Sequence, residues 1–149
     1  MNRCLRVLPP VLFLLLTAIA PSCRDKVSNC SGSVCRSNVR ALHLAVLNYV
    51  SDNDWKNPKS IGDLYTGRYV LASTLLCPSS GHSTGSLDDI ERWTDYVYVP
   101  FSGRLIDMTD EQKQRTPLFI ERSPTNHGVS GPTIIYLDGH VWPLPDPCP

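Results

Sequence analysis

The chain is 149 residues long, which is room for one domain with a modest core. Hydrophobic residues make up 42% of it and charged residues 19%, a composition that is typical of a folded globular protein and excludes a disordered one. Acidic and basic residues balance at 14 each, so no charge excess points to nucleic acid or to an anionic membrane surface.

The first segment predicts a secretory signal peptide over residues 1–22. Arg3 and Arg6 precede an apolar run over residues 11–20, which is too short to cross a bilayer comfortably, and small residues follow. Removing this leader leaves 14 − 2 = 12 basic residues against 14 acidic ones, a net charge of −2. We therefore expect an exported protein, either anchored at a membrane or periplasmic or extracellular.

Cys23 is a candidate lipid anchor. Ala20, Pro21 and Ser22 precede it and resemble a bacterial lipoprotein box, in which the new N-terminal cysteine is lipidated, although such boxes usually carry leucine where this chain has Ala20. Ala20 and Ser22 also satisfy the small-residue rule of an ordinary signal peptidase. A plain signal peptide cut at the same bond is therefore the alternative.

The mature chain is predicted to pass from a polar tether, residues 23–33, into one domain over residues 34–149. Apolar residues over residues 34–50 recur at helical spacing and predict the one long helix of the protein. They include Val39, Leu42, Val46, Tyr49 and Val50. The helix should end at SDNDWKNP, where polar side chains compete for backbone hydrogen bonds and the proline disfavours helix before it.

Shorter elements follow this helix. Residues 60–64 predict a short helical turn, and the Ser/Gly tract over residues 78–86 predicts a loop. YVYVP at residues 96–100 and PLFIE at residues 117–121 carry the aromatic and β-branched side chains of strands.

The chain closes with two extended runs, residues 133–137 and 140–144, on either side of Asp138-Gly139. This pattern predicts a β-hairpin with a two-residue type I′ turn, which needs positive φ at both central residues. The fold class is therefore α+β, with one long N-terminal helix packed on a small antiparallel sheet that ends in the hairpin.

Two interpretations fit the histidines near this hairpin. His127, Asp138 and His140 could converge on a metal ion or a proton, since imidazole and carboxylate suit zinc. Alternatively, the turn itself needs Asp138 and Gly139, and His127 donates a hydrogen bond that holds the incoming loop to the hairpin. We favour this second interpretation. There is no GxSxG elbow for a serine triad, and we assign no catalytic residue, cofactor or resident metal.

The other histidines and the tryptophans are given structural interpretations. His43 lies among apolar helix residues and is predicted to pack there, and His82, in the Ser/Gly loop, is assigned no role. Trp55, Trp93 and Trp142 are predicted to pack in or around the core.

Cysteine usage agrees with export. With Cys4 removed in the leader and Cys23 lipidated, four remain, which are Cys30, Cys35, Cys77 and Cys148. An even number in an oxidising compartment predicts two disulfides, with three possible connectivities. A zinc site from the same four is the competing interpretation, but the CxxC pairs that such sites favour are missing.

Several stretches taken in order resemble the soluble part of pseudopilin-related bacterial proteins that carry an H-X9-DG element. The stretches are CRSNVRALHLAVLNYVSDNDWKNPKSIGDL, LLCPSSG, DYVYVP and PLFIERSPTNHGVSGPTIIYLDGHVW, within residues 35–143. The matching motif positions are Cys35 with Asn38, Cys77 with Pro78, and His127 with Asp138, Gly139, His140 and Val141.

The chain departs from that family in two ways. The spacing between His127 and Asp138 is one residue longer than the family name implies, which indicates a longer loop or a bulge. The short basic leader, the processing site and the apolar polymerising helix of pseudopilins are also missing. Filament assembly by the usual route is therefore not expected.

The resemblance implies a non-catalytic envelope protein that acts by protein contacts in or near a type II secretion or surface-assembly system. The alternatives are an exported ligand- or metal-binding module or enzyme that uses the 127–140 hairpin, and a filament built without the usual helix. Some pseudopilins hold calcium in a loop. Asp107, Asp110 and Glu111 could serve here, but a solvated acidic loop is the simpler interpretation.

For the cysteines we predict one disulfide between Cys35 and Cys77 and another between Cys30 and Cys148. The first would tie the helix start to the connecting region. The second would tie the tether to the C-terminus.

Overall fold

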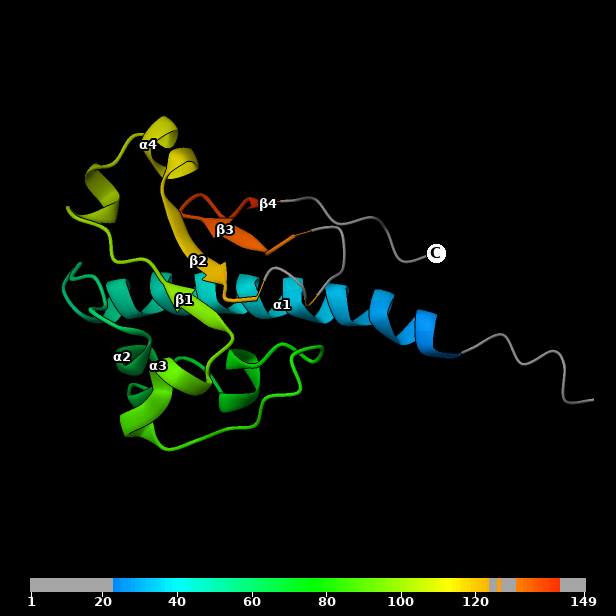
Figure 1. Ribbon diagram of the computed structural model, residues 1–149. Helices are drawn as coiled ribbons and strands as arrows, with labels where there is room; N and C mark the ends of the chain where they lie inside the picture. Colours follow the sequence, from blue (N-terminus) through cyan, green and yellow to red (C-terminus); the bar gives the residue numbers. More distant parts are fainter. Residues whose placement is uncertain (1–22, 124–125, 127–130, 143–149) are drawn as a thin grey trace, which may run out of the picture.

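A computed structural model describes residues 23–123, 126 and 131–142 of the chain. Its fold is α+β, as predicted: a long N-terminal helix lies against an antiparallel sheet of four strands, with short helices around them (Figure 1). In Figure 1, β2, β3 and β4 lie above the long helix, and α2 and α3 lie below it. No helix in these ranges is both long enough and apolar enough to cross a membrane.

Helix α1, Cys23–Asp52, supports the rest of the fold. Its buried face repeats at intervals of three and four residues, through Val39, Leu42, Val46 and Val50, each no more than 1% exposed. The helix begins earlier than predicted, because α1 includes residues 23–33, the segment predicted as a polar tether. Once the packed part of a helix has formed, adding further helical residues at its end costs little free energy, because the unfavourable nucleation step is already complete. The periodicity of apolar residues predicts only the part of a helix that has an apolar face, so it does not predict this extension.

The sheet has the order β1-β2-β3-β4, and every neighbouring pair is antiparallel. The strands are β1 (Tyr96–Tyr98), β2 (Pro117–Glu121), β3 (Ile134–Tyr136) and β4 (Val141–Trp142). The predicted strands are confirmed, although β1 and β3 are shorter than expected and β4 begins one residue later than expected. A register shift between Pro117 and Phe119 places an irregularity in β2 where it pairs with β3.

Short helices fill the connections between these larger elements. They are α2 (Ile61–Thr66), the 3₁₀ helices η2 (Ala72–Leu75), η3 (Leu87–Asp89) and η4 (Leu105–Asp107), and α3 (Ile90–Trp93) and α4 (Asp110–Arg115). The predicted helical turn is α2, which begins with a capping box. The Ser60 side chain accepts a hydrogen bond from the Asp63 N–H, and the Asp63 carboxylate accepts one from the Ser60 N–H.

The core lies between α1 and the sheet, which touch through β2 and β3. Leu118, Phe119 and Ile135 are fully buried there, and the Phe119 ring lies 5.3 Å from that of Tyr98. Strands β2 and β3 therefore pack against the buried face of α1, which the spacing of its apolar residues predicts.

The turn between β3 and β4 differs from the predicted type I′ turn. The Gly139 N–H donates to the Tyr136 carbonyl at 2.9 Å, and the Tyr136 N–H donates to the His140 carbonyl at 3.0 Å. Gly139 has φ of 88°, whereas Asp138 is not in the positive-φ region. The hairpin is confirmed, but its loop has three residues, Leu137, Asp138 and Gly139, with one left-handed glycine.

Candidate functional site

Residues 136–140, here called the hairpin turn, hold an aspartate and a histidine that bond to each other. His140 Nδ1–H donates to Asp138 Oδ1 at 2.6 Å, the His140 N–H donates to the same oxygen at 3.0 Å, and the His140 ring stacks on Tyr136 with centroids 4.1 Å apart. Burial opposes ionisation of Asp138, but the hydrogen bonds from His140 outweigh it and lower the pKa of that carboxyl. This geometry supports the structural interpretation of the turn. His127 lies outside the described residues, so its predicted contact stays a prediction.

A histidine on α1 fastens the hairpin turn to the helix. His43 Nε2–H donates to the Leu137 carbonyl at 3.0 Å, across 94 positions of sequence. A Cβ added to Gly139 would lie 3.1 Å from His43 Cε1. Gly139 is therefore required both for its positive φ and for close approach to the helix. His43 packs as predicted, but its bond to the turn could not be read from the helix pattern.

Cys35 and Cys77, the predicted disulfide partners, lie side by side in the core. Cys35 belongs to α1, Cys77 follows η2, and their side chains are 0% and 2% exposed. Their Sγ atoms lie within 4.8 Å of each other. The bond itself stays a prediction. Cys148 lies outside the described residues, so its pairing with Cys30 stays a prediction too.

Glu121, at the end of β2, lies close to both of these cysteines. It is 1% exposed, and a carboxylate oxygen lies within 4.8 Å of both sulfur atoms. Its Oε1 accepts from Asn126 Nδ2 at 2.9 Å, and its Oε2 accepts from the Thr133 N–H at 3.2 Å. Thiolate and carboxylate are ligands that zinc accepts. The PLFIE pattern predicts only a strand, and nothing in it indicates that the Glu121 side chain is buried beside the cysteines.

Tyr96 completes what we call the buried cysteine cluster, namely Cys35, Cys77, Tyr96 and Glu121. The Tyr96 side chain is fully buried, and its hydroxyl makes no hydrogen bond of normal geometry within the described part of the chain. Burial raises the pKa of this phenol far above its usual value, and the neighbouring Cys35 and Cys77 raise it further. The cluster therefore contains a neutral phenol whose hydroxyl lies near Cys35 and Asn38 without a hydrogen bond of normal geometry within the described ranges.

Asp95 fixes the backbone beside the cluster. It is 1% exposed, and its Oδ2 accepts from the Cys77 N–H at 2.7 Å and from Ser80 Oγ at 2.6 Å. Its Oδ1 accepts from His82 Nδ1–H at 2.7 Å. His82, for which the sequence predicts no role, is thus one of three donors to a buried carboxylate, although its own side chain is 54% exposed.

The acidic residues considered for calcium each lie beside a cation of their own segment. The pairs are Asp107 with Arg104 at 2.8 Å, Asp110 with Lys113 at 3.9 Å, and Glu111 with Arg115 at 2.9 Å. The hydrogen bond from Arg104 lowers the pKa of Asp107. This arrangement matches a solvated loop and helix start.

The tryptophans do not share one environment. Trp93 is buried, and its Nε1–H donates to the Ser86 carbonyl at 2.8 Å, as expected for a packed residue. Trp55 and Trp142 are 45% and 60% exposed. Packing in the core is therefore confirmed for Trp93, whereas Trp55 and Trp142 lie at the surface, and their packing around the core stays a prediction.

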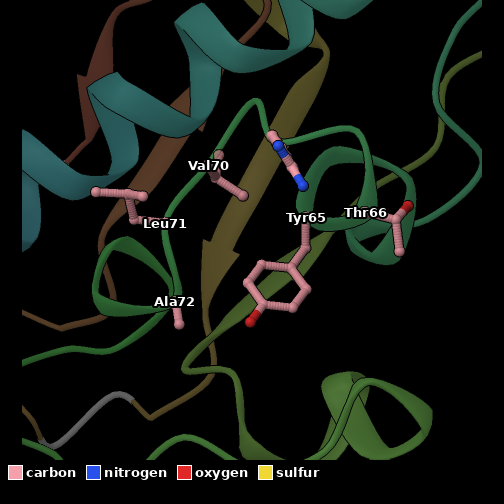
Figure 2. Close-up of a pocket in the computed structure, with 6 residues that line it drawn as sticks. Tyr65, Thr66, Val70, Leu71 and Ala72 are labelled. Carbon is pink, nitrogen blue, oxygen red and sulfur yellow. The ribbon is translucent and has the colours of Figure 1, made fainter.

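An open recess of about 400 Å³ lies beside α2 and the segment that follows it (Figure 2). It is lined by Tyr65, Thr66, Arg68, Val70, Leu71 and Ala72. Arg68 adopts a left-handed conformation, with φ of 63°, and Leu71 is 72% exposed. This lining brings together no acid–base pair.

Comparison with known proteins gives no relative on which to base an assignment: no protein-family model, no curated protein and no solved structure matches the chain.

Proposed function

We propose that the chain is a non-catalytic envelope protein, exported and lipid-anchored at Cys23, whose pseudopilin-like domain acts through protein contacts. These contacts would lie in or near a secretion or surface-assembly system. The observation that carries the proposal is the continuity of α1, which starts at Cys23 and runs into the core without a break.

This continuity changes the mechanism expected from the sequence. The buried positions of α1 begin at Cys35, so the helix continues for about 12 residues, roughly 18 Å, between Cys23 and the domain, and it joins the two as a short rod and not as a flexible tether. A domain on a rod has a fixed height and a restricted orientation above the membrane. Protein contacts made by such a domain cost less ordering entropy than contacts made by a freely tethered one.

The hairpin turn gives little support to the alternative of a ligand-binding module or enzyme. Asp138 and His140 satisfy each other, and the His140 ring is stacked on Tyr136. A metal ion or substrate would have to displace these bonds before it gained any from the protein.

Fractionation of cells tests the proposal. Wild-type chain should sediment with membranes and withstand salt washing, whereas Cys23→Ser should leave the membrane fraction. Cys30→Ser is the matched control, because it removes a cysteine from the same helix and should fractionate as wild type. Membrane association of Cys23→Ser equal to that of wild type would contradict the lipid anchor.

Contacts are tested with a photoreactive side chain at exposed apolar positions of the anchored protein. Suitable positions are Leu44, Leu71, Ile106 and Trp142, which are 57%, 72%, 58% and 60% exposed. The proposal expects discrete adducts with envelope proteins at one or more of these positions, reduced when Cys23 is replaced. Irradiated cells without adducts at any position would count against it.

A further inference from the structure

We propose that the chain, when its thiols are reduced, holds one thiophilic divalent cation such as Zn²⁺ between Cys35 Sγ, Cys77 Sγ and a carboxylate oxygen of Glu121. This inference goes beyond the envelope function and does not depend on it. The three residues come from α1, from the segment after η2 and from β2, so the site exists only in the folded chain.

The spacing of the donor atoms suits a small cation. All three lie within 4.8 Å of one another. Zn–S bonds of about 2.3 Å and Zn–O bonds of about 2.1 Å in a tetrahedron put the ligand atoms roughly 3.5–3.8 Å apart. A contraction of about 1 Å, which side-chain rotation can supply, is therefore enough. Three protein ligands leave one position of the tetrahedron for a small ligand such as water.

Metal binding and loss of the thiol protons are coupled at this site. Two thiolates and one carboxylate inside the core are costly without a counter-charge, so both thiols ionise only together with the binding of a cation. A divalent cation offsets two of the three negative charges. Binding breaks the two S–H bonds and forms two metal–sulfur bonds, and the protons pass to solvent, so no oxidation state changes.

Other residues hold the ligands in place. Asp95 accepts a hydrogen bond from the Cys77 N–H at 2.7 Å, which fixes the backbone of one ligand. Asn126 Nδ2 and the Thr133 N–H both donate to the Glu121 carboxylate, at 2.9 and 3.2 Å. Bonds of this kind orient metal ligands and reduce the reorganisation that binding requires.

Tyr96 provides a second observation, which does not depend on the distances between the three ligand atoms. Its hydroxyl is fully buried beside Cys35 and lacks a hydrogen bond of normal geometry to any described residue. A thiol or a disulfide sulfur is a weak acceptor, whereas a thiolate is a strong one. The phenol therefore gains a good acceptor when Cys35 is a metal-bound thiolate, but not when it is in a disulfide.

The proposal is compatible with the predicted Cys35–Cys77 bond, because the two describe different redox states of the same sulfur atoms. Oxidation removes both thiolate ligands and should expel the metal. Metal binding in turn should protect the thiols from oxidation and alkylation.

The test is a titration of the full-length chain with Co²⁺ and then Zn²⁺ in the presence of a phosphine reductant. One equivalent of Co²⁺ should produce a thiolate-to-cobalt charge-transfer band and the visible bands of a tetrahedral site, and Zn²⁺ should abolish both. Native mass spectrometry should show one bound zinc per chain. Chain that mass spectrometry shows to be reduced and circular dichroism shows to be folded, but that binds no stoichiometric metal, would overturn the proposal.

Variants separate this site from adventitious binding. Glu121→Gln keeps the size and the acceptor of the side chain but removes its charge, and should weaken binding about 10–100-fold. Glu91→Gln is the matched control on an exposed glutamate, and Cys30→Ser and Cys148→Ser control for the remaining cysteines. All three should bind as wild type. Equal affinity in Glu121→Gln, or loss of binding in a control that circular dichroism shows to be folded, would refute the assignment.

Discussion

The hairpin turn and the buried cysteine cluster are built in opposite ways. The bonds within the turn join residues two to four positions apart, such as Asp138 with His140, and its polar side chains are partly exposed. The cluster brings Cys35, Cys77 and Glu121 together from three distant segments and buries them all. Asp138 and His140, which look like metal ligands in the sequence, thus stabilise the turn. The three side chains that converge as possible ligands, Cys35, Cys77 and Glu121, lie far apart in the sequence.

Mutation of the buried cysteine cluster should lower the free energy of unfolding more than mutation of the hairpin turn. In oxidised protein, loss of the predicted Cys35–Cys77 bond by Cys35→Ser should lower the free energy of unfolding by about 2–5 kcal/mol. Denaturant unfolding with and without reductant measures this: metal-free wild type should lose stability on reduction far more than the variant does. A non-reducing peptide map that pairs Cys35 with another cysteine would contradict the assignment.

Asp95→Ala should have the next largest effect, about 2–4 kcal/mol, because it leaves the buried Cys77 N–H and the Ser80 hydroxyl without their acceptor. His82→Ala removes only the most exposed of the three donors and should cost less than about 1 kcal/mol. Chemical denaturation of both variants gives the comparison. If both variants lose the same free energy of unfolding, Asp95 stabilises the protein only through its exposed bond to His82 and not by supporting the backbone of Cys77.

In the hairpin turn, Gly139→Ala should cost about 1–2 kcal/mol for the left-handed backbone, with an additional loss from contact with His43. Gly103→Ala is a close control, since Gly103 has φ of 85° and no atom lies within 4 Å of an added Cβ. Thermal or chemical unfolding should show Gly139→Ala as the more damaging change. If the difference persists after His43→Ala, the helix contact is not its cause.

The smallest effect concerns pH. Hydrogen bonds from His140 lower the pKa of Asp138, so this carboxylate adds stability above its unfolded pKa of about 3.9, and that stability is lost as the pH falls through the lower folded value. Carboxyl chemical shifts followed by NMR should show the depressed pKa in wild type and a rise toward the usual value in His140→Ala. An unchanged pKa in the variant would show that the pair is not formed in solution.

Much of the fold could be predicted from the sequence, because its signals are local. The spacing of Val39, Leu42, Val46 and Val50 predicts the buried face of α1, and Asp138-Gly139 between extended runs predicts the last hairpin. The start of the helix was missed, because the segment before residue 34 shows no apolar periodicity. The type of turn was missed too, because the buried Leu137 belongs to the loop and not to the strand.

The candidate site was less accessible to sequence reasoning. Glu121 is one residue of a strand pattern and Asp95 precedes another strand, and neither position shows that its side chain is buried. Their partners, Cys35 and Cys77 for Glu121 and His82 for Asp95, lie 13 to 86 positions away in the sequence. Only the packing of α1 against the end of β2 brings the cluster together. By contrast, the alternation of aromatic and β-branched residues in YVYVP was sufficient to predict β1.

The most direct test of the envelope proposal is mass spectrometry of the mature N-terminus. The account predicts a chain that begins at Cys23 with a diacylglycerol on its sulfur, from which α1 continues as a rod into the domain. A mature chain that retains residues 1–22, or that begins at Cys23 with a free thiol, would contradict the lipid anchor.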